Sequence, residues 1–130
     1  MRGYLVAGTN YGDRRANLLA AISYVGSICN ITGQSEIYES PDFLGSGSPY
    51  CNVVLEIETP KCETELEVMF KDYEFRAGRT SQRRERGEVP VDIDIVIWDD
   101  RIRRPLDFNS AYFRKGFSQI CNSDIVKISK

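Results

Sequence analysis

The sequence predicts an α+β domain in which an antiparallel sheet packs against helices on one of its faces. Apolar segments with the length and spacing of strands occupy residues 4–7, 35–39, 51–58 and 91–98. Apolar stripes with helical spacing occupy residues 13–26 and 59–78. The order strand, helix, strand, strand, helix, strand is that of the ferredoxin-like βαββαβ fold. We therefore expect residues 1–130 to form a single domain with this topology.

The first strand and the first helix follow from simple patterns. Residues 4–7 are an unbroken apolar run that ends at Gly8, which is typical of a central strand buried on both faces. Asp13 is a helix-capping residue type, and apolar residues then recur at helical spacing up to Gly26. These features predict a strand buried at the centre of the sheet, followed by a helix that packs on it.

The next strand and helix are marked by alternation and by turn residues. Residues 51–58 alternate between apolar and polar side chains, which predicts a strand with one solvated face. Thr59 and Pro60 provide a cap and a first-turn proline for the second helix. Gly78 is suited to the left-handed conformation that ends a helix.

The last predicted strand carries two acidic residues. Alternation places Asp92 and Asp94 on one face together with Val96 and Trp98, and the isoleucines on the other face. A further short strand is expected near residues 102–106, and an irregular tail follows it.

Composition excludes several classes of function. The formal net charge is -2, so the chain lacks the general positive field with which proteins hold nucleic acids or anionic membranes. The absence of histidine removes the usual general base of hydrolase triads and a common zinc ligand. No apolar run is long enough for a signal peptide or a membrane span, so we expect a cytoplasmic protein.

Asp92 and Asp94 are the strongest candidates for chemistry. Residues two apart in a strand point to the same side, so their carboxylates lie roughly 7 Å apart along the chain. Two nearby carboxylates at the margin of a core raise each other's pKa, a cost that a hard divalent cation removes. From these residues alone, metal binding and an ordinary solvated face are about equally favoured.

Arginines are concentrated just before this strand. Five of them lie between the second helix and the acidic strand, at positions 76, 79, 83, 84 and 86. A solvated loop and a nucleic-acid site are the alternatives, but no aromatic residues for base stacking are interleaved with them. Acids that bind magnesium beside arginines that bind phosphate oxygens are the combination that phosphoryl transfer requires.

Five motifs, in this order, resemble the 6-hydroxymethyl-7,8-dihydropterin pyrophosphokinase family over residues 4 to about 117. They are residues 8–13, residues 38–41, residues 50–52, Glu74 with residues 78–79, and residues 90–95. The resemblance implies a ferredoxin-like domain that transfers pyrophosphate from ATP to the hydroxymethyl group of the reduced pterin, releasing AMP, in folate biosynthesis.

The resemblance also implies roles for individual residues. Asp92 and Asp94 would bind two Mg²⁺ ions and, with Arg79, form the catalytic centre. The implied pterin-binding residues are Thr9, Asn10, Ser40, Pro41, Phe43, Tyr50, Asn52 and Phe117. The expected ATP-binding residues are Glu74, Arg83, Arg84, Ile95, Arg104 and Lys115. Residues 79–87 would form a mobile loop that closes over both substrates.

The chain departs from the family pattern in the arginine-rich segment. The family shows Arg-x-Arg and Trp-Gly-Pro-Arg where this chain has residues 79–81 and 86–89, and the Pro-His segment after the acidic strand is replaced. Arg83, Arg84, Arg104 or Lys115 are expected to compensate. The alternative hypothesis is a non-catalytic module that binds the pterin or the nucleotide. A monomer or weak dimer is expected, with small-molecule substrates and no nucleic acid or membrane partner.

Overall fold

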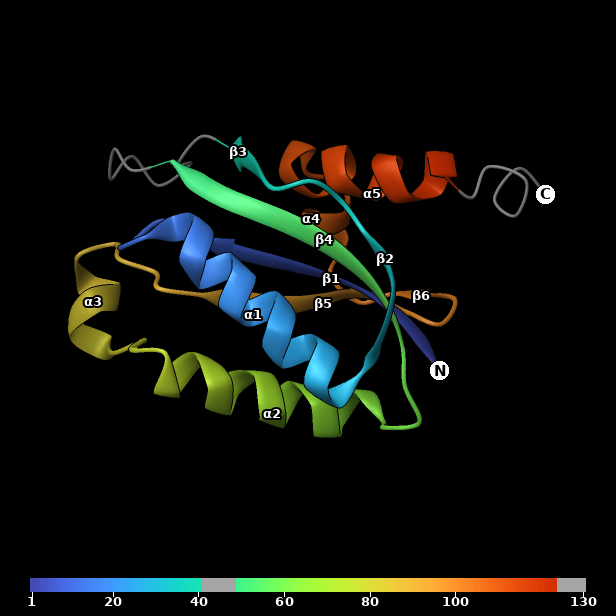
Figure 1. Ribbon diagram of the computed structural model, residues 1–130, viewed down its shortest axis with the longest axis horizontal. Coiled ribbons are helices and arrows are strands. Elements are labelled where there is room, and N and C mark those ends of the chain that lie inside the picture. Colours follow the sequence, from blue (N-terminus) through green and yellow to red (C-terminus); the bar gives the residue numbers. More distant parts are fainter. Residues whose placement is uncertain (41–48, 124–130) are drawn as a thin grey trace.

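The computed structural model describes residues 1–40 and 49–123. It contains an antiparallel sheet with helices on both of its faces (Figure 1). The elements are β1 (Arg2–Thr9), α1 (Arg14–Ile28), β2 (Asn30–Gln34), β3 (Tyr38–Ser40), β4 (Tyr50–Glu58), α2 (Glu63–Arg76), α3 (Ser81–Glu85), β5 (Asp92–Trp98), β6 (Arg101–Ile102), α4 (Pro105–Phe108) and α5 (Ala111–Ser123).

The sheet has β1 at its centre, as the sequence predicts. The strand order is β2-β4-β1-β5-β6. Strand β3 also pairs with β4, at residues 50–52, whereas β2 pairs with residues 55–58 of that strand. Every pairing is antiparallel. The predicted strand at residues 35–39 is observed as β3, and β2 precedes it as a separate strand. The α+β, ferredoxin-like prediction is therefore confirmed.

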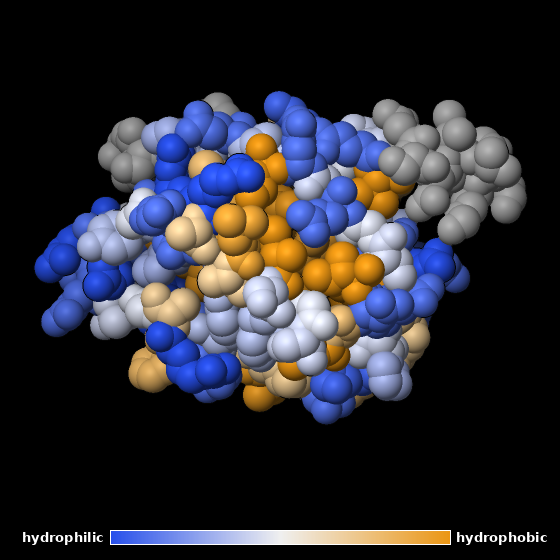
Figure 2. Space-filling model, in the orientation of Figure 1, coloured by the Kyte–Doolittle hydropathy of each residue, from blue (hydrophilic) through white to orange (hydrophobic). Residues whose placement is uncertain are grey.

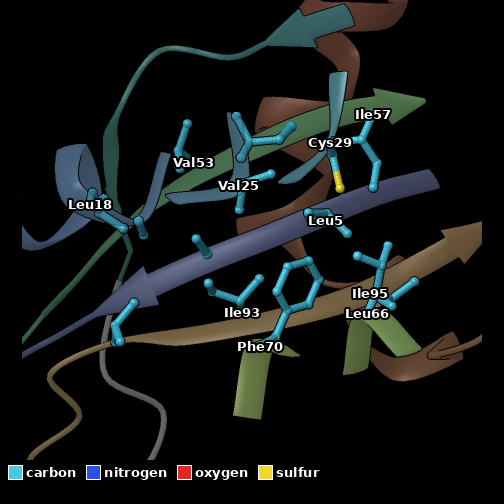
Figure 3. Close-up of a cluster of buried hydrophobic side chains, with 14 of the residues drawn as sticks. Leu5, Leu18, Val25, Cys29, Val53, Ile57, Leu66, Phe70, Ile93 and Ile95 are labelled. Atoms are coloured by element: carbon cyan, nitrogen blue, oxygen red, sulfur yellow. The ribbon is translucent and has the colours of Figure 1, made fainter. Parts of the chain in front are cut away.

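Helices α1 and α2 cover one face of the sheet, and the main hydrophobic core lies beneath them (Figure 3). Asp13 caps α1, since its Oδ1 accepts a hydrogen bond of 3.1 Å from the Ala16 amide. The prediction for the start of α2 was wrong. Thr59 accepts from the Lys61 amide in a turn, and α2 begins only at Glu63. Gly78 ends this segment with φ at 104°, as predicted.

Helix α5 covers the opposite face and corrects three predictions. Helices lie on both faces of the sheet and not on one. Residues 111–123 of the expected irregular tail form a helix, and β4 is not half exposed, because α5 buries the side of β4 that was expected to be solvated. Even Glu56 is buried there, where its carboxylate accepts hydrogen bonds from Tyr4 and Thr32. The signal for α5 was present in the sequence, since aromatic and apolar residues recur at helical spacing at positions 113, 117 and 120.

Gly116 allows α5 to pack this closely, and Gly116→Ala tests it. A Cβ atom there would lie 2.6 Å from Val54 Cγ2 and 2.7 Å from the Tyr38 hydroxyl. Overpacking costs about 1–3 kcal/mol, whereas alanine gains about 1 kcal/mol of helix propensity. We expect the free energy of unfolding in urea to fall by about 1–2 kcal/mol. Gly26→Ala in α1 is the matched control: its Cβ meets only Ile31 at 3.5 Å, so we expect stabilisation. Equal stabilisation by both would contradict the packing.

The far end of β5 also differs from the prediction. The pairing of β1 with β5 shifts register, so that Tyr4 faces Ile97 and Leu5 faces Ile95. Val96 is the extra residue of this irregularity, and simple alternation therefore stops there. Trp98 consequently joins the core under α1 and α2, not the face of Val96. The predicted strand at residues 102–106 is reduced to β6, because Pro105 begins α4.

Candidate active site

On the α5 face of the sheet, three strands meet at Gly8, a position without a side chain that we call the Gly8 hollow. In register, Gly8 of β1 pairs with Asn52 of β4 on one side and with Asp92 of β5 on the other. A Cβ at Gly8 would lie 3.1 Å from Asn52 Oδ1 and 3.5 Å from the Tyr50 ring. The glycine therefore lets a carboxamide and an aromatic ring lie close to the backbone of β1, with a carboxylate on the strand at its other side. Asn52 is buried and donates a hydrogen bond of 2.7 Å to the Ser40 hydroxyl, which fixes its amide.

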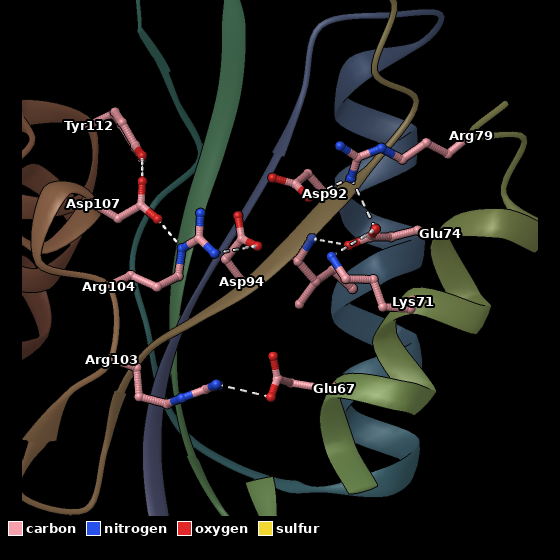
Figure 4. Close-up of polar contacts among 11 residues, drawn as sticks. Glu67, Lys71, Glu74, Arg79, Asp92, Asp94, Arg103, Arg104, Asp107 and Tyr112 are labelled. Atoms are coloured by element: carbon pink, nitrogen blue, oxygen red, sulfur yellow. Dashed lines mark hydrogen bonds and ion pairs between the residues drawn. The ribbon is translucent and has the colours of Figure 1, made fainter. Parts of the chain in front are cut away.

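Beside the hollow, three carboxylates and two arginines meet at the free edge of β5 (Figure 4). Arg79 Nη1 lies 2.5 Å from Asp92 Oδ1 and 2.9 Å from Glu74 Oε1, so one nitrogen joins two acids. Glu74 comes from α2, and its other oxygen accepts a hydrogen bond of 2.8 Å from the Ile93 amide. Asp94, one step along the same face, lies 3.8 Å from Arg104 Nη1.

The acids of this cluster have shifted pKa values. Burial raises the pKa of Asp94 to about 8, and hydrogen bonding and repulsion from Asp92 add to the effect. Burial also acts to raise the pKa of Asp92, but the hydrogen bond with Asp94 and the charge of Arg79 outweigh it and lower the pKa. Burial raises the pKa of Glu74. The pair thus shares a proton near neutral pH, as two carboxylates do when no cation separates them.

These shifts predict a stability that depends on pH and on divalent cations. The folded-state pKa of Asp94 is raised, so its contribution is fully present below the ordinary pKa of 3.8 and is lost as pH rises toward 8. In EDTA, we expect the free energy of unfolding to fall by about 2 kcal/mol or more between pH 5 and pH 8.5, at about 1.4 kcal/mol per pKa unit. Urea titrations with Mg²⁺ should show a smaller fall. A pH profile of Asp94→Asn that matches the wild type would refute the assignment.

The chain matches a known family along most of its length. A family model described as 7,8-dihydro-6-hydroxymethylpterin-pyrophosphokinase matches residues 4–122. The chain belongs to this pyrophosphokinase family. It is also 34% identical over 103 residues to a 2-amino-4-hydroxy-6-hydroxymethyldihydropteridine pyrophosphokinase of Aquifex aeolicus strain VF5. That match covers 78% of this chain and 63% of the relative, so the chain spans less than two thirds of the relative's length.

The structure brings together only part of the pterin-binding set expected for this pyrophosphokinase family. Ser40, Tyr50 and Asn52 line or support the hollow at Gly8. Pro41 and Phe43 lie outside the described residues. Phe117 is partly buried against the core under α5, with its ring centroid 5.0 Å from that of Tyr4 and 5.2 Å from that of Phe113.

Thr9 and Asn10 are placed where they hold the chain before β5. The Thr9 hydroxyl donates to the Val89 carbonyl at 3.1 Å. The Asn10 carboxamide donates to the Gly87 carbonyl and accepts from the Val89 amide, at 2.7 and 2.6 Å. Both side chains are buried. Thr9 and Asn10 therefore fix the segment that precedes Asp92, and their side chains do not line the hollow.

The arginine-rich segment contains a short helix where sequence and resemblance suggested a mobile loop. Thr80 caps α3, since its hydroxyl accepts from the Arg83 amide at 3.2 Å. The Arg83 guanidinium lies 4.7 Å from the centroid of the Tyr11 ring and 3.8 Å from Glu88. Arg84 is exposed on the same helix. Lys115 of α5 lies 5.2 Å from the centroid of the Tyr38 ring.

A small cavity of about 120 Å³ adjoins Asp94 on the other side from Gly8. Ile95 and Arg104, both expected nucleotide contacts, line it. The cavity also has lining residues that the sequence reasoning missed, namely Glu67, Phe70, Lys71, Ile93 and Arg103. Spacing contained a signal for some of them, because Glu67 and Lys71 precede Glu74 by seven and three residues on one face of α2.

Arg104 is held by residues that the sequence reasoning also missed. Its Nε donates to the Asp107 carboxylate, to which the Tyr112 hydroxyl also donates (Figure 4). These partners on α4 and α5 fix the guanidinium beside Asp94. Spacing contained a signal for this contact, because Asp107 follows Arg104 by three residues and precedes Tyr112 by five. None of the helices within residues 1–40 and 49–123 has the length and apolar character needed to cross a membrane.

Proposed function

We propose that this chain transfers pyrophosphate from ATP to the hydroxymethyl group of 6-hydroxymethyl-7,8-dihydropterin and releases AMP. One observation carries the proposal beyond family membership: the sheet register sets Asn52 and Asp92 on either side of Gly8. Asn52, which would hydrogen-bond a flat heterocycle, and Asp92, which would hold the cations that bind phosphate, therefore lie on the two strands that flank β1. An acceptor bound in the hollow presents its hydroxymethyl group toward the acidic pair.

The pterin occupies the hollow over Gly8 in this proposal. A buried carboxamide offers both a donor and an acceptor, which suits the paired amino and oxo groups of a pterin ring. The hydrogen bond with Ser40 sets the orientation of the Asn52 amide, and the ring of Tyr50 lies beside the opening. We do not include Phe117 in this pocket, because its ring is packed against Tyr4 and Phe113.

Asp92 and Asp94 fit a magnesium site, with two ions expected from the resemblance. Mg²⁺ prefers carboxylate oxygens and is usually held by one or two of them together with substrate phosphates. Burial and Asp92 raise the pKa of Asp94 although Arg79 pairs with Asp92 and Arg104 lies near Asp94, so a cation at the pair would relieve the remaining repulsion. When bound, the cations would neutralise the phosphate oxygens and orient the reacting groups.

Part of the nucleotide occupies the cavity beyond Asp94, since about 120 Å³ is smaller than the roughly 300 Å³ or more of a complete small-molecule site. On α2, the side chains of Glu74, Lys71 and Glu67 follow one another, and the first and last are about 10 Å apart along the helix at 1.5 Å per residue. This is about the length from a nucleotide's first phosphate to its base. Lys71 and Arg104 then lie at the level of the phosphates and ribose, and Glu67 at the level of the base.

The arginines neutralise the charge of the phosphates. Arg79 forms an ion pair with the Asp92 carboxylate in the free protein. If a cation took the place of Arg79 at this carboxylate, the guanidinium would bind the phosphates. Arg83 and Arg84 on α3 and Lys115 on α5 approach from the other sides and take the place of the arginines that the family motif has at positions 81 and 89. With no histidine in the chain, positioning and charge neutralisation supply the rate enhancement.

The decisive experiment measures AMP formation with Mg²⁺, ATP and the reduced pterin. We expect AMP and the pterin pyrophosphate in equal amounts, and no AMP when the pterin or Mg²⁺ is omitted. Asn52→Ala should raise the KM for the pterin by at least about tenfold, the effect of losing a buried hydrogen-bonding group. Absence of pterin-dependent AMP would reject the enzymatic proposal.

The second candidate is a module that binds the same ligands without turnover. Val89 and Ser81 favour it, because neither side chain carries the charge that the family motif places there. Calorimetry that detects pterin and nucleotide binding in a preparation that forms no AMP would support this alternative over the enzyme.

A further inference from the structure

Beyond its first two residues, helix α1 carries no charged side chain, although no described element covers its outer face. Residues 16–28 contain no Asp, Glu, Lys or Arg. Leu18, Ala21 and Val25 face the core, yet Leu19 on the opposite side is 49% exposed. A helix that is uncharged and largely apolar all round is normally buried on both sides. Neighbouring α2 differs, because its exposed side carries the charged pair Asp72 and Arg76.

The uncovered side of α1 continues into an apolar surface. Figure 2 shows hydrophobic side chains gathered over α1 and the strands beside it. Ile22 of α1, Ile31 of β2 and Ile37 before β3 are partly buried against the core and partly open to the surface. Contiguous apolar surface of this kind marks an interaction site more often than a solvated face.

The charges at the two ends of α1 indicate what covers it. Arg14 and Arg15 lie in the first turn, where the helix dipole is positive, and the last turn has no basic residue. Within one copy, Glu39 compensates Arg14 at 2.7 Å, whereas the charge of Arg15 at the positive end of the helix is unfavourable. An antiparallel second α1 would bring each Arg15 near the negative end of the partner helix. Each α1 has a basic first turn and a negative last turn. In a symmetric antiparallel pair, the basic turn of each copy therefore lies beside the negative turn of the other.

We propose that the α1 surface, formed by Leu19, Ile22, Ile31 and Ile37, is the interface of a symmetric dimer of this chain. The two copies pack α1 against α1 in antiparallel orientation across a two-fold axis. This surface lies on the face of the sheet opposite the hollow at Gly8. The dimer does not depend on the proposed reaction, because its test measures mass and not turnover.

Sedimentation velocity of the full chain, from low micromolar to a few hundred micromolar, tests the proposal. We expect the mass to rise with concentration toward twice 14.8 kDa. Leu19→Glu should raise the dimer dissociation constant at least about tenfold, since it buries a charge in the contact. Leu106→Glu is the matched control, because Leu106 is 90% exposed on α4 and should leave the constant within about twofold.

Arg15→Glu separates a dimer effect from a folding effect. An acid in the first turn of a helix is favourable, so the variant should melt at or above the wild-type Tm. The same change removes the charge that faces the partner, so the dissociation constant should rise about threefold or more. A wild type that remains monomeric throughout would overturn the proposal. So would a dimer that Leu19→Glu leaves intact, or one that Leu106→Glu weakens equally.

Discussion

Asp94→Asn is expected to lower pterin-dependent AMP formation at least about a thousandfold, the scale of losing a principal electrostatic contact in a transition state. Asparagine keeps the shape of the side chain and one oxygen, so the loss isolates the negative charge. The buried position of Asp94 and its proximity to Asp92 predict that no other carboxylate replaces it. Steady-state kcat at saturating Mg²⁺ is the measurement.

Asp100→Asn is the matched control for this variant. Asp100 is an exposed acid just beyond the end of the same strand, so its loss tests general charge effects. We expect its kcat to stay within about twofold of the wild type. A kcat for Asp94→Asn within about tenfold of the wild type would remove the acid pair from the proposed mechanism.

Arg79→Gln should have the second largest effect, and it acts on two measurements in opposite directions. Loss of a charge that meets the phosphates should lower kcat about a hundredfold. Loss of the counter-ion should free Asp92, so Mg²⁺ in the absence of nucleotide should bind more tightly than to the wild type. Without Mg²⁺ the variant should lose about 2–3 kcal/mol of stability, because Glu74 is left buried with less compensation.

Arg76→Gln provides the comparison. Arg76 pairs with Asp72 at 2.9 Å on the exposed side of α2, where both side chains are more than half exposed. Exposed pairs of this kind contribute about 0.3–0.5 kcal/mol, so stability and Mg²⁺ affinity should hardly change. If Arg79→Gln behaved like Arg76→Gln in urea titrations and in calorimetry with Mg²⁺, Arg79 would not be the counter-ion of the acid pair.

The sequence alone predicted the elements whose patterns are local. The central strand, the cap at Asp13, the end of α2 at Gly78 and the common side of Asp92 and Asp94 all depend on neighbours within a few residues. Strand alternation and helix periodicity are enforced by backbone geometry, so they are readable before the fold is known. The pairing of acids with arginines was also visible, because the residues are close along the chain.

Other features of the site depended on contacts between distant segments. Glu74 accepts a hydrogen bond from the Ile93 amide because α2 packs beside β5, whereas the contacts that hold Arg104 through Asp107 and Tyr112 are local in sequence. Helix α5 buries Glu56, whose local pattern favoured exposure. It also packs Phe117, which the family resemblance placed in the pterin pocket, partly buried against Tyr4 and Phe113. Burial depends on the total cover of a surface, and a local sequence window does not contain that information.

For this protein, the sequence determined the central strand, the acidic pair and the family to which the chain belongs. Tertiary structure decided what lies around that pair. Sheet register put Asn52 and Asp92 on either side of Gly8, and a single guanidinium, that of Arg79, joined Glu74 to Asp92. The physical reason is that side-chain direction is a local property of the backbone, whereas proximity across strands and helices is fixed only when the whole core packs.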